Sequence, residues 1–112
     1  MISGIVMYPN TPGGHFDWTY YLNTHIPLAL RRLGSAVKDW TVEQGVAGME
    51  PGSAPAYVAM ARFLFDSLEA FQQAFAPHAD ELLGDIPNYT NIQPTIQFSE
   101  VKMSTAEAVR HI

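Results

Sequence analysis

One stretch of the chain combines residues able to transfer a proton with the apolar surroundings that tune such chemistry. Within residues 16–28, His25 follows Tyr21 by four positions and Tyr20 by five. A histidine titrates near neutrality, so an imidazole in an apolar cavity can take a proton from a carbon acid or a phenol and return it elsewhere. A neighbouring tyrosine can orient the substrate or donate a hydrogen bond to a developing oxyanion. His25 and Tyr21 are therefore the candidate catalytic residues, and Tyr20 is a candidate for the same pocket.

A helix over residues 16–33 is expected to position these side chains. Its apolar stripe, which contains the histidine and should face the core, is formed by Trp18, Tyr21, Leu22, His25, Leu28, Ala29 and Leu33. Pro27 offers no N–H to the carbonyl of Asn23, which predicts a kink just after His25. A core histidine hydrogen-bonded to that freed carbonyl is the alternative interpretation. Asp17 is a pocket candidate, although capping of the helix start is its expected role.

Composition limits the classes of protein to which this helix can belong. The 112 residues suit one domain spanning 1–112, and a chain that is 47% hydrophobic but only 15% charged is expected to fold with an unusually apolar surface. Such a surface suggests an oligomer interface. The formal charge is −5 and basic residues do not cluster, so nucleic acid is excluded as an expected partner.

Cysteine usage and histidine spacing argue against a built-in metal or cofactor. The chain has no cysteine, and its histidines stand far apart at His15, His25, His78 and His111. We therefore expect no metal and no cofactor. The first residues lack a basic region and their apolar run is too short for a signal peptide or a membrane span, so a cytoplasmic protein without a membrane partner is expected.

Hydrophobic periodicity and turn residues predict the order of the other elements. Strands are expected at residues 2–8, 37–46, 56–65 and 95–103, with a long connector at 45–55. A second helix begins near a capping pattern at 66–69, is interrupted at Pro77 and continues for a turn or two to residue 83. Residues 84–91 look irregular, and a short helix is expected after Ser104. This βαββαβ order predicts an α+β, ferredoxin-like fold, with an antiparallel four-stranded sheet and both helices on one face.

The third expected strand is apolar on both of its faces. Residues 57, 59, 61, 63 and 65 alternate with 58, 60, 62 and 64, and only Arg62 among them is charged. Because helices cover one face, we predict that a homodimer buries the other. An aromatic pocket wall is expected from Trp40, Tyr57, Phe63 and Phe65, each with ordinary core packing as the alternative. His78 is a second pocket candidate, with a solvated helix end as its alternative.

Several of these segments resemble the EthD family of the dimeric α+β barrel superfamily. The resemblance is carried by Phe16-Asp17, Tyr20-Tyr21 and His25-x-Pro27-Leu28, with support from Tyr8-Pro9, Arg62-Phe63, Asn88-Tyr89 and Ser99-Glu100-Val101. It spans nearly the whole chain, and its most specific part is the aromatic-x3-His-x-Pro-Leu segment. The resemblance implies a homodimer whose sheets enclose a small barrel, with the helix histidine lining a pocket between helix and sheet.

The resemblance does not select one reaction, because the superfamily includes cofactor-free monooxygenases, lactone isomerases and polyketide cyclases. The leading hypothesis is an enzyme with an acid/base histidine acting on a hydrophobic, aromatic or lactone-like compound. A non-catalytic carrier module that assists a degradative oxygenase is the alternative. Haem binding with oxidative breakdown is a third hypothesis, with His25 or His78 as the ligand.

Overall fold

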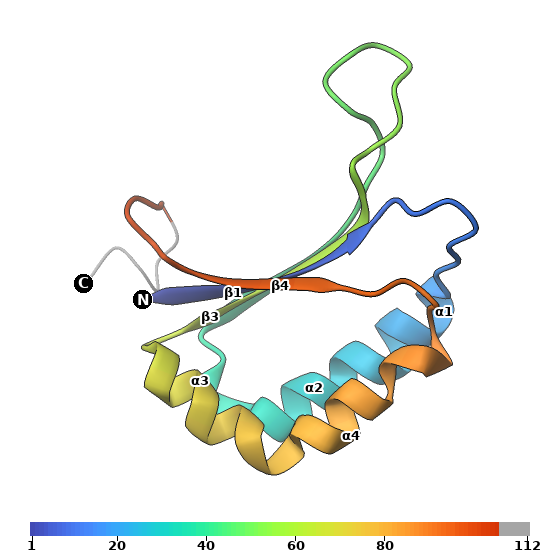
Figure 1. Ribbon diagram of the computed structural model, residues 1–112. Helices are drawn as coiled ribbons and strands as arrows, with labels where there is room; N and C mark the ends of the chain where they lie inside the picture. The colour runs from blue at the N-terminus through green and yellow to red at the C-terminus, as the bar shows by residue number, and fades with distance from the viewer. Residues whose placement is uncertain (106–112) are drawn as a thin grey trace.

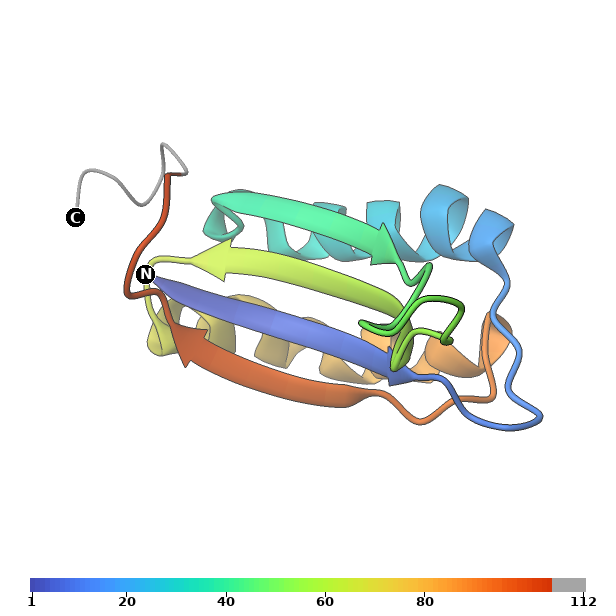
Figure 2. The same ribbon diagram turned by 90° about the horizontal axis from the view of Figure 1, so that it is seen from above.

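The computed structural model describes residues 1–105, and the strands found there form one antiparallel sheet (Figures 1 and 2). The strands are β1 (Ile2–Pro9), β2 (Asp39–Gln44), β3 (Tyr57–Phe65) and β4 (Thr95–Glu100). Their spatial order is β2-β3-β1-β4. Strands β2 and β4 are shorter than predicted, and the connector between β2 and β3 projects away from the sheet (Figure 1). The predicted succession of strands along the chain is otherwise confirmed.

Two helical regions pack on the same face of this sheet (Figure 1). The first comprises α1 (Trp18–Tyr20), η1 (Tyr21–His25), α2 (Ile26–Leu33) and η2 (Gly34–Ala36). The second comprises α3 (Leu68–Phe75), η3 (Ala76–His78), α4 (Ala79–Gly84) and η4 (Ile86–Asn88). The predicted ferredoxin-like fold is therefore confirmed. The helix expected after Ser104 lies outside the described residues, and every described helix is too short or too polar to cross a bilayer.

Both helical regions begin and end as their sequences dictate. The Asp17 carboxylate accepts a hydrogen bond from the Tyr20 N–H at 3.0 Å, which confirms the capping role expected of Asp17. Ser67 caps α3 in the same way by accepting from the Ala70 N–H at 3.0 Å. The first region ends where Gly34 adopts a φ of 58°, a conformation that other residues avoid.

The backbone that carries His25 is π-helical. The Ile26 N–H donates to the Tyr21 carbonyl, five residues earlier, and Pro27 then lies at the start of α2, where a missing N–H is tolerated. The kink predicted just after His25 stays a prediction, and the backbone there has a wider turn that ends at His25. This turn changes the rotation of the helix, so Ile26 is 4% exposed, whereas Leu22, predicted to be in the stripe, is 48% exposed.

The two faces of the sheet differ in what covers them. Gly4 and Val6 of β1 pair with Phe63 and Ala61 of β3 on the face that packs on the helices. The opposite face carries a group of apolar residues, here called the outer patch, formed by Ile5, Met7, Val58, Met60 and Leu64, and the charged Arg62 lies among them opposite Ile5. Polar residues of β2 and β4 flank the outer patch, and no described helix lies over it (Figure 1). The prediction that both faces of β3 are largely apolar is confirmed, with Arg62 as the charged exception.

The segment between α4 and β4 returns along the start of the first helical region. The Asp17 N–H donates to the Tyr89 carbonyl at 2.8 Å, and the Thr90 hydroxyl donates to the His15 carbonyl at 2.6 Å. Phe16 and Thr90 also form an isolated β-bridge. These contacts hold Tyr89 and Thr90 beside the start of the helical region that carries His25.

Candidate functional site

A cavity of about 280 Å³ lies between the helical regions and the sheet. It is lined by Gly4, Val6, Tyr8, Tyr21, His25, Ile26, Ala29, Leu33, Ala61, Phe63, Phe65, Phe71, Phe75, Leu82, Leu83, Ile86, Ile96 and Phe98. A side chain at Gly4 would narrow the cavity, because an added Cβ would approach the Phe98 ring to 3.0 Å. The size is at the small end of the range for ligand pockets. The cavity thus suits a compact ligand.

Polar groups gather at one end of this cavity. Tyr8, Tyr21 and His25 are its polar lining residues, and every other lining residue is apolar. The Tyr21 and His25 rings stack, with centroids 5.7 Å apart and planes 13° apart. The Tyr8 ring meets the Tyr21 ring edge-on at 6.0 Å. A bound molecule would therefore meet its few polar contacts in one place and apolar walls elsewhere.

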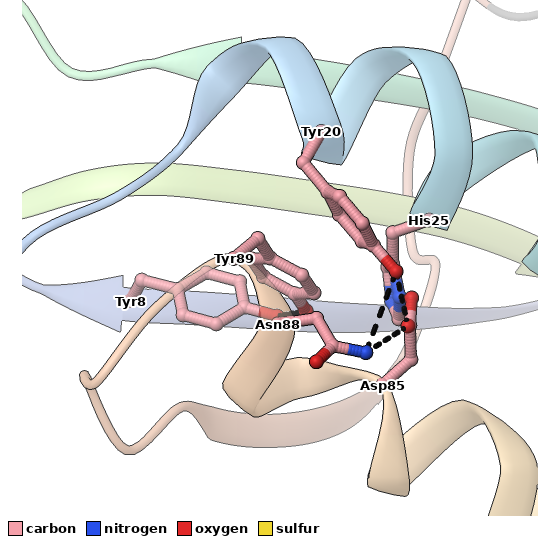
Figure 3. A network of polar contacts seen from close by, with 6 residues as sticks. All are labelled: Tyr8, Tyr20, His25, Asp85, Asn88 and Tyr89. Atoms are coloured by element: carbon pink, nitrogen blue, oxygen red, sulfur yellow. Dashed lines mark hydrogen bonds and ion pairs between the residues drawn. The ribbon is translucent and has the colours of Figure 1, made fainter.

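His25 is paired with a buried carboxylate. Its Nδ1 lies 2.8 Å from Asp85 Oδ2, and each of the two side chains is only 11% exposed (Figure 3). The π-helical turn supplies His25, and Asp85 follows α4 directly, so the contact joins segments that are 60 residues apart in the chain. Such a pairing fixes the orientation of the imidazole ring.

Two further groups hold the Asp85 carboxylate. The Tyr20 hydroxyl donates to Oδ1 at 2.6 Å and the Asn88 side-chain amide donates to the same oxygen at 2.9 Å (Figure 3). Asn88 also reaches the Tyr20 oxygen at 3.4 Å. Burial acts to raise the pKa of Asp85, but the hydrogen bonds from Tyr20, Asn88 and His25 outweigh it, and the net pKa is lowered. Asp85 is therefore ionised at neutral pH.

The charge on Asp85 determines the tautomer of His25. Burial lowers the pKa of His25 below its ordinary value of 6.5, opposed by the Asp85 hydrogen bond and charge, so the ring is neutral at neutral pH. A carboxylate can only accept, so Nδ1 of the neutral ring carries the hydrogen. The other ring nitrogen, Nε2, keeps a lone pair on a residue that lines the cavity. This arrangement provides a proton acceptor.

A second polar pair lies beside the first. The Tyr8 and Tyr89 hydroxyl oxygens are 2.6 Å apart, and both residues are 1% exposed (Figure 3). The Tyr89 ring also contacts the His25 ring, with centroids 4.6 Å apart. Burial raises the pKa of both tyrosines, so both are protonated at neutral pH.

The structure places the predicted site residues in three groups. His25, Tyr21, Phe63 and Phe65 line the cavity. Tyr20 lies behind it, against Asp85, and Asp17 caps the helix. Trp40, Tyr57 and His78 do not line it. Trp40 belongs to edge strand β2, is 46% exposed and lines a separate hollow on the outer side of the sheet, while His78 is the last residue of η3, directly before α4.

Sequence reasoning missed Tyr8, Asp85, Asn88 and Tyr89 as site residues. Three of them belong to residues 84–91, which have no helical or strand periodicity and therefore give no indication of where side chains point. The one available signal was the presence of an aspartate, an asparagine and a tyrosine within five positions of an apolar helix end. Among residues 1–105, no group of three histidine or carboxylate side chains is arranged to hold a metal ion.

Comparison with known proteins places the chain among similar sequences and structures. The EthD domain model matches residues 15–93. A crystal structure of an EthD-like protein from Ralstonia eutropha JMP134 is 48% identical, covers 95% of this chain and 96% of that chain, and has a TM-score of 0.88. An EthD family protein from Bacillus halodurans C-125 is 21% identical over 91% of this chain and 99% of that chain, with a TM-score of 0.70, a likeness that shows the fold alone. No curated protein matches the chain.

Proposed function

The chain belongs to the EthD domain family, and we propose that it is a small-molecule enzyme in which His25 acts as an acid/base group in an apolar cavity. The observation that carries the proposal is the 2.8 Å contact between His25 Nδ1 and the buried Asp85 carboxylate, which leaves Nε2 as a proton acceptor. The proposed substrate is a hydrophobic aromatic or lactone-like compound. The proposed reaction is of the isomerase, cyclase or cofactor-free monooxygenase type.

The lining of the cavity supports a neutral ligand. The lining residues include no lysine, arginine, aspartate or glutamate, and His25 is neutral. A charged ligand would therefore lose its hydration without gaining a charged partner. The volume of about 280 Å³ suits one or two fused rings better than a macrocycle such as haem.

In the proposed step, His25 Nε2 removes a proton from a carbon acid or a phenol of the ligand. The C–H or O–H bond breaks, its electrons stay on the ligand, and the imidazole becomes an imidazolium. Asp85 stabilises that positive charge, as a buried carboxylate 2.8 Å away must. Return of the proton to a different atom completes an isomerisation and regenerates neutral His25. In a ring closure, the freed electron pair first attacks a carbonyl carbon of the same ligand, the carbonyl π electrons move to its oxygen, and the imidazolium returns the proton to that oxygen.

A binding or carrier module is the second candidate function. It is favoured by the large apolar share of the lining, because walls formed by phenylalanine, leucine and isoleucine retain a ligand without any chemistry. Turnover of a bound compound separates the two candidates, since a carrier retains its ligand unchanged.

We also propose that the protein acts as a homodimer. The outer patch, defined above by Ile5, Met7, Val58, Met60 and Leu64, is an apolar sheet face that a second copy can bury by packing sheet against sheet. Light scattering at low micromolar concentration is expected to give twice the mass of the chain. A folded monomer under those conditions would contradict this part of the proposal.

The function is tested with a panel of small phenols, quinones and lactones. Compounds that raise the midpoint of thermal unfolding are incubated with the protein, and the products are analysed. We expect turnover with the unchanged chain, loss of turnover in His25→Gln, and normal turnover in His78→Gln, the matched change at a histidine that does not line the cavity. Equal turnover by the His25 and His78 variants would refute the proposal, and binding without any product would favour the carrier.

A further inference from the structure

The pair formed by Tyr8 and Tyr89 contains one more hydrogen than its own hydrogen bond uses. Each hydroxyl has one hydrogen and can also accept, and the two oxygens are 2.6 Å apart. One hydroxyl therefore donates to the other, which leaves the hydrogen of the accepting hydroxyl for a different partner. Among residues 1–105, no third side chain or carbonyl accepts a hydrogen bond from either oxygen.

The position of the cavity indicates which of the two hydroxyls donates to the other and which can donate to a ligand. Tyr8 lines the cavity and Tyr89 does not, although both are 1% exposed. If Tyr8 donated, the Tyr89 hydrogen would be buried among rings without an acceptor, which is costly. If Tyr89 donates, the Tyr8 hydrogen is available to a molecule in the cavity. The second arrangement is the favourable one.

The two hydroxyls also keep their hydrogens at neutral pH, because burial raises the pKa of both tyrosines. A hydroxyl that accepts a hydrogen bond becomes a better donor through its own hydrogen, so donation by Tyr89 polarises Tyr8. Tyr8 also lies on the same polar end of the cavity as His25, connected through the stacked ring of Tyr21.

We propose that Tyr8 binds the oxygen of a neutral, enolisable ketone or ester, and that Tyr89 orients and polarises the Tyr8 hydroxyl. The proposal rests on the proposed function for the identity of the base. When His25 removes the proton next to the carbonyl, the C–H electrons form a carbon–carbon double bond and the carbonyl π electrons move to the oxygen. Tyr8 donates its hydrogen bond to that enolate oxygen, and the imidazolium later returns the proton to carbon. No oxidant or reductant is required.

The binding half of the proposal is tested with two probes that differ only in a hydroxyl group, 2-naphthol and naphthalene. The preference for 2-naphthol is the ratio of its affinity to that of naphthalene. In Tyr8→Phe this ratio should fall by about tenfold while the naphthalene affinity stays unchanged, because only one hydrogen bond is lost. The unchanged naphthalene affinity also shows that the variant is folded. Tyr57→Phe is the matched control, since Tyr57 loses the same atom but does not line the cavity. Tyr89→Phe should have a smaller effect than Tyr8→Phe.

The catalytic half is tested by hydrogen–deuterium exchange into 2-tetralone, a neutral bicyclic ketone, in D2O. The unchanged chain should catalyse exchange next to the carbonyl, and Tyr8→Phe should slow it by about 10²-fold, the usual loss for one oxyanion donor. His25→Gln should abolish exchange while Tyr8 still confers preference for 2-naphthol.

The two experiments separate failure of this inference from failure of the proposed function. Exchange and 2-naphthol preference that are both unchanged in Tyr8→Phe would overturn the role of Tyr8 while the acid/base function of His25 stands. A preference lost in Tyr21→Phe instead would also overturn it, because Tyr21 would then be the donor. No exchange by the unchanged chain, with a Tyr8-dependent preference for 2-naphthol, would support Tyr8 as the oxygen-binding residue and refute the base.

Discussion

Two contacts between a basic and an acidic side chain join the first helical region to the second, and they differ in their surroundings. His25 meets Asp85 at 2.8 Å beside the cavity, and Arg32 meets Glu81 at 2.7 Å on the surface. The side chains of the first pair are 11% exposed, whereas those of the second are 40% and 45% exposed. The distances are nearly equal, so burial and neighbouring groups separate the two contacts.

The surface pair is a local bridge and the buried pair is part of a network. Arg32 donates two hydrogen bonds to Glu81, at 2.7 and 3.2 Å, in a setting where water and salt screen the charges. Asp85 instead accepts from three side chains where water is largely excluded. The comparison indicates that burial and a complete set of hydrogen bonds, rather than a short distance, distinguish the contact that can orient His25 and hold a hydrogen on its Nδ1.

The largest effect should come from neutralising the buried carboxylate. In Asp85→Asn, the amide can donate to Nδ1 and so favour the wrong tautomer, in which Nε2 carries the hydrogen and cannot act as a base. We expect turnover of the best panel compound to fall by about 10²–10⁴-fold, the usual range for loss of acid/base catalysis. Steady-state kinetics give the size of the loss.

Glu81→Gln is the matched change in the surface pair. It removes one charge and keeps the shape of the side chain, as Asp85→Asn does, yet turnover should stay near that of the unchanged chain. If the two variants lost activity to the same extent, the contrast between the buried and the surface pair would have no functional meaning.

A smaller effect should come from removing one of the groups that hold Asp85. Tyr20→Phe deletes the 2.6 Å hydrogen bond to Oδ1 and leaves those from Asn88 and His25. Turnover should fall by about tenfold, because the carboxylate is less firmly oriented but remains ionised. Tyr57→Phe serves as the control in the same assay, and an equal loss in both variants would show that Tyr20 acts on the fold rather than on the site.

The buried pair should also be visible in the pH dependence. Because burial lowers the pKa of His25, the acid limb of kcat/KM should lie below the ordinary histidine value of 6.5. Loss of the Asp85 charge removes a contribution that raises this pKa, so residual activity of Asp85→Asn should persist to still lower pH. The unfolded chain takes up the His25 proton first as the pH falls below 6.5, so stability should decrease there. An acid limb above 6.5 would contradict the burial argument.

Salt should produce the smallest difference between the two pairs. Raising the ionic strength screens exposed charges over a few ångströms but affects a buried pair little. The Glu81→Gln variant should therefore approach the unfolding midpoint of the unchanged chain as NaCl is added, whereas the difference for Asp85→Asn should persist. Thermal unfolding in low and high salt measures the difference in midpoint between each variant and the unchanged chain. If both differences changed equally with salt, the two pairs would not differ in their exposure to solvent.

The sequence was informative where periodicity decides which way side chains point. Periodicity, turn residues and capping patterns along the chain predicted the element order and the ferredoxin-like fold, and the helical spacing around His25 predicted a histidine facing the core beside Tyr21. The π-helical turn was not predictable in this way, because its rotation differs from that of an α-helix. That difference exposed Leu22 and buried Ile26.

The residues that contact His25 could not be predicted from the sequence, for a different physical reason. Asp85 lies 60 residues from His25, in a segment rich in turn-forming residues whose path is set by backbone contacts to residues 15–17. Tyr8 and Tyr89 are 81 residues apart, and each looks like an ordinary core tyrosine in the sequence. Contacts of this kind depend on how the elements pack, which the periodicity of a single segment does not encode.

Nitrogen-15 NMR of the histidine side chains tests the central claim most directly, since it reports both the charge and the tautomer of each ring. The signal of His25 is identified by its loss in His25→Gln. We predict a neutral ring at pH 7 with the hydrogen on Nδ1 and a titration midpoint below 6.5, because Asp85 accepts from Nδ1 and burial lowers the pKa. A His25 ring that is positively charged at pH 7, or that carries its hydrogen on Nε2, would contradict the account.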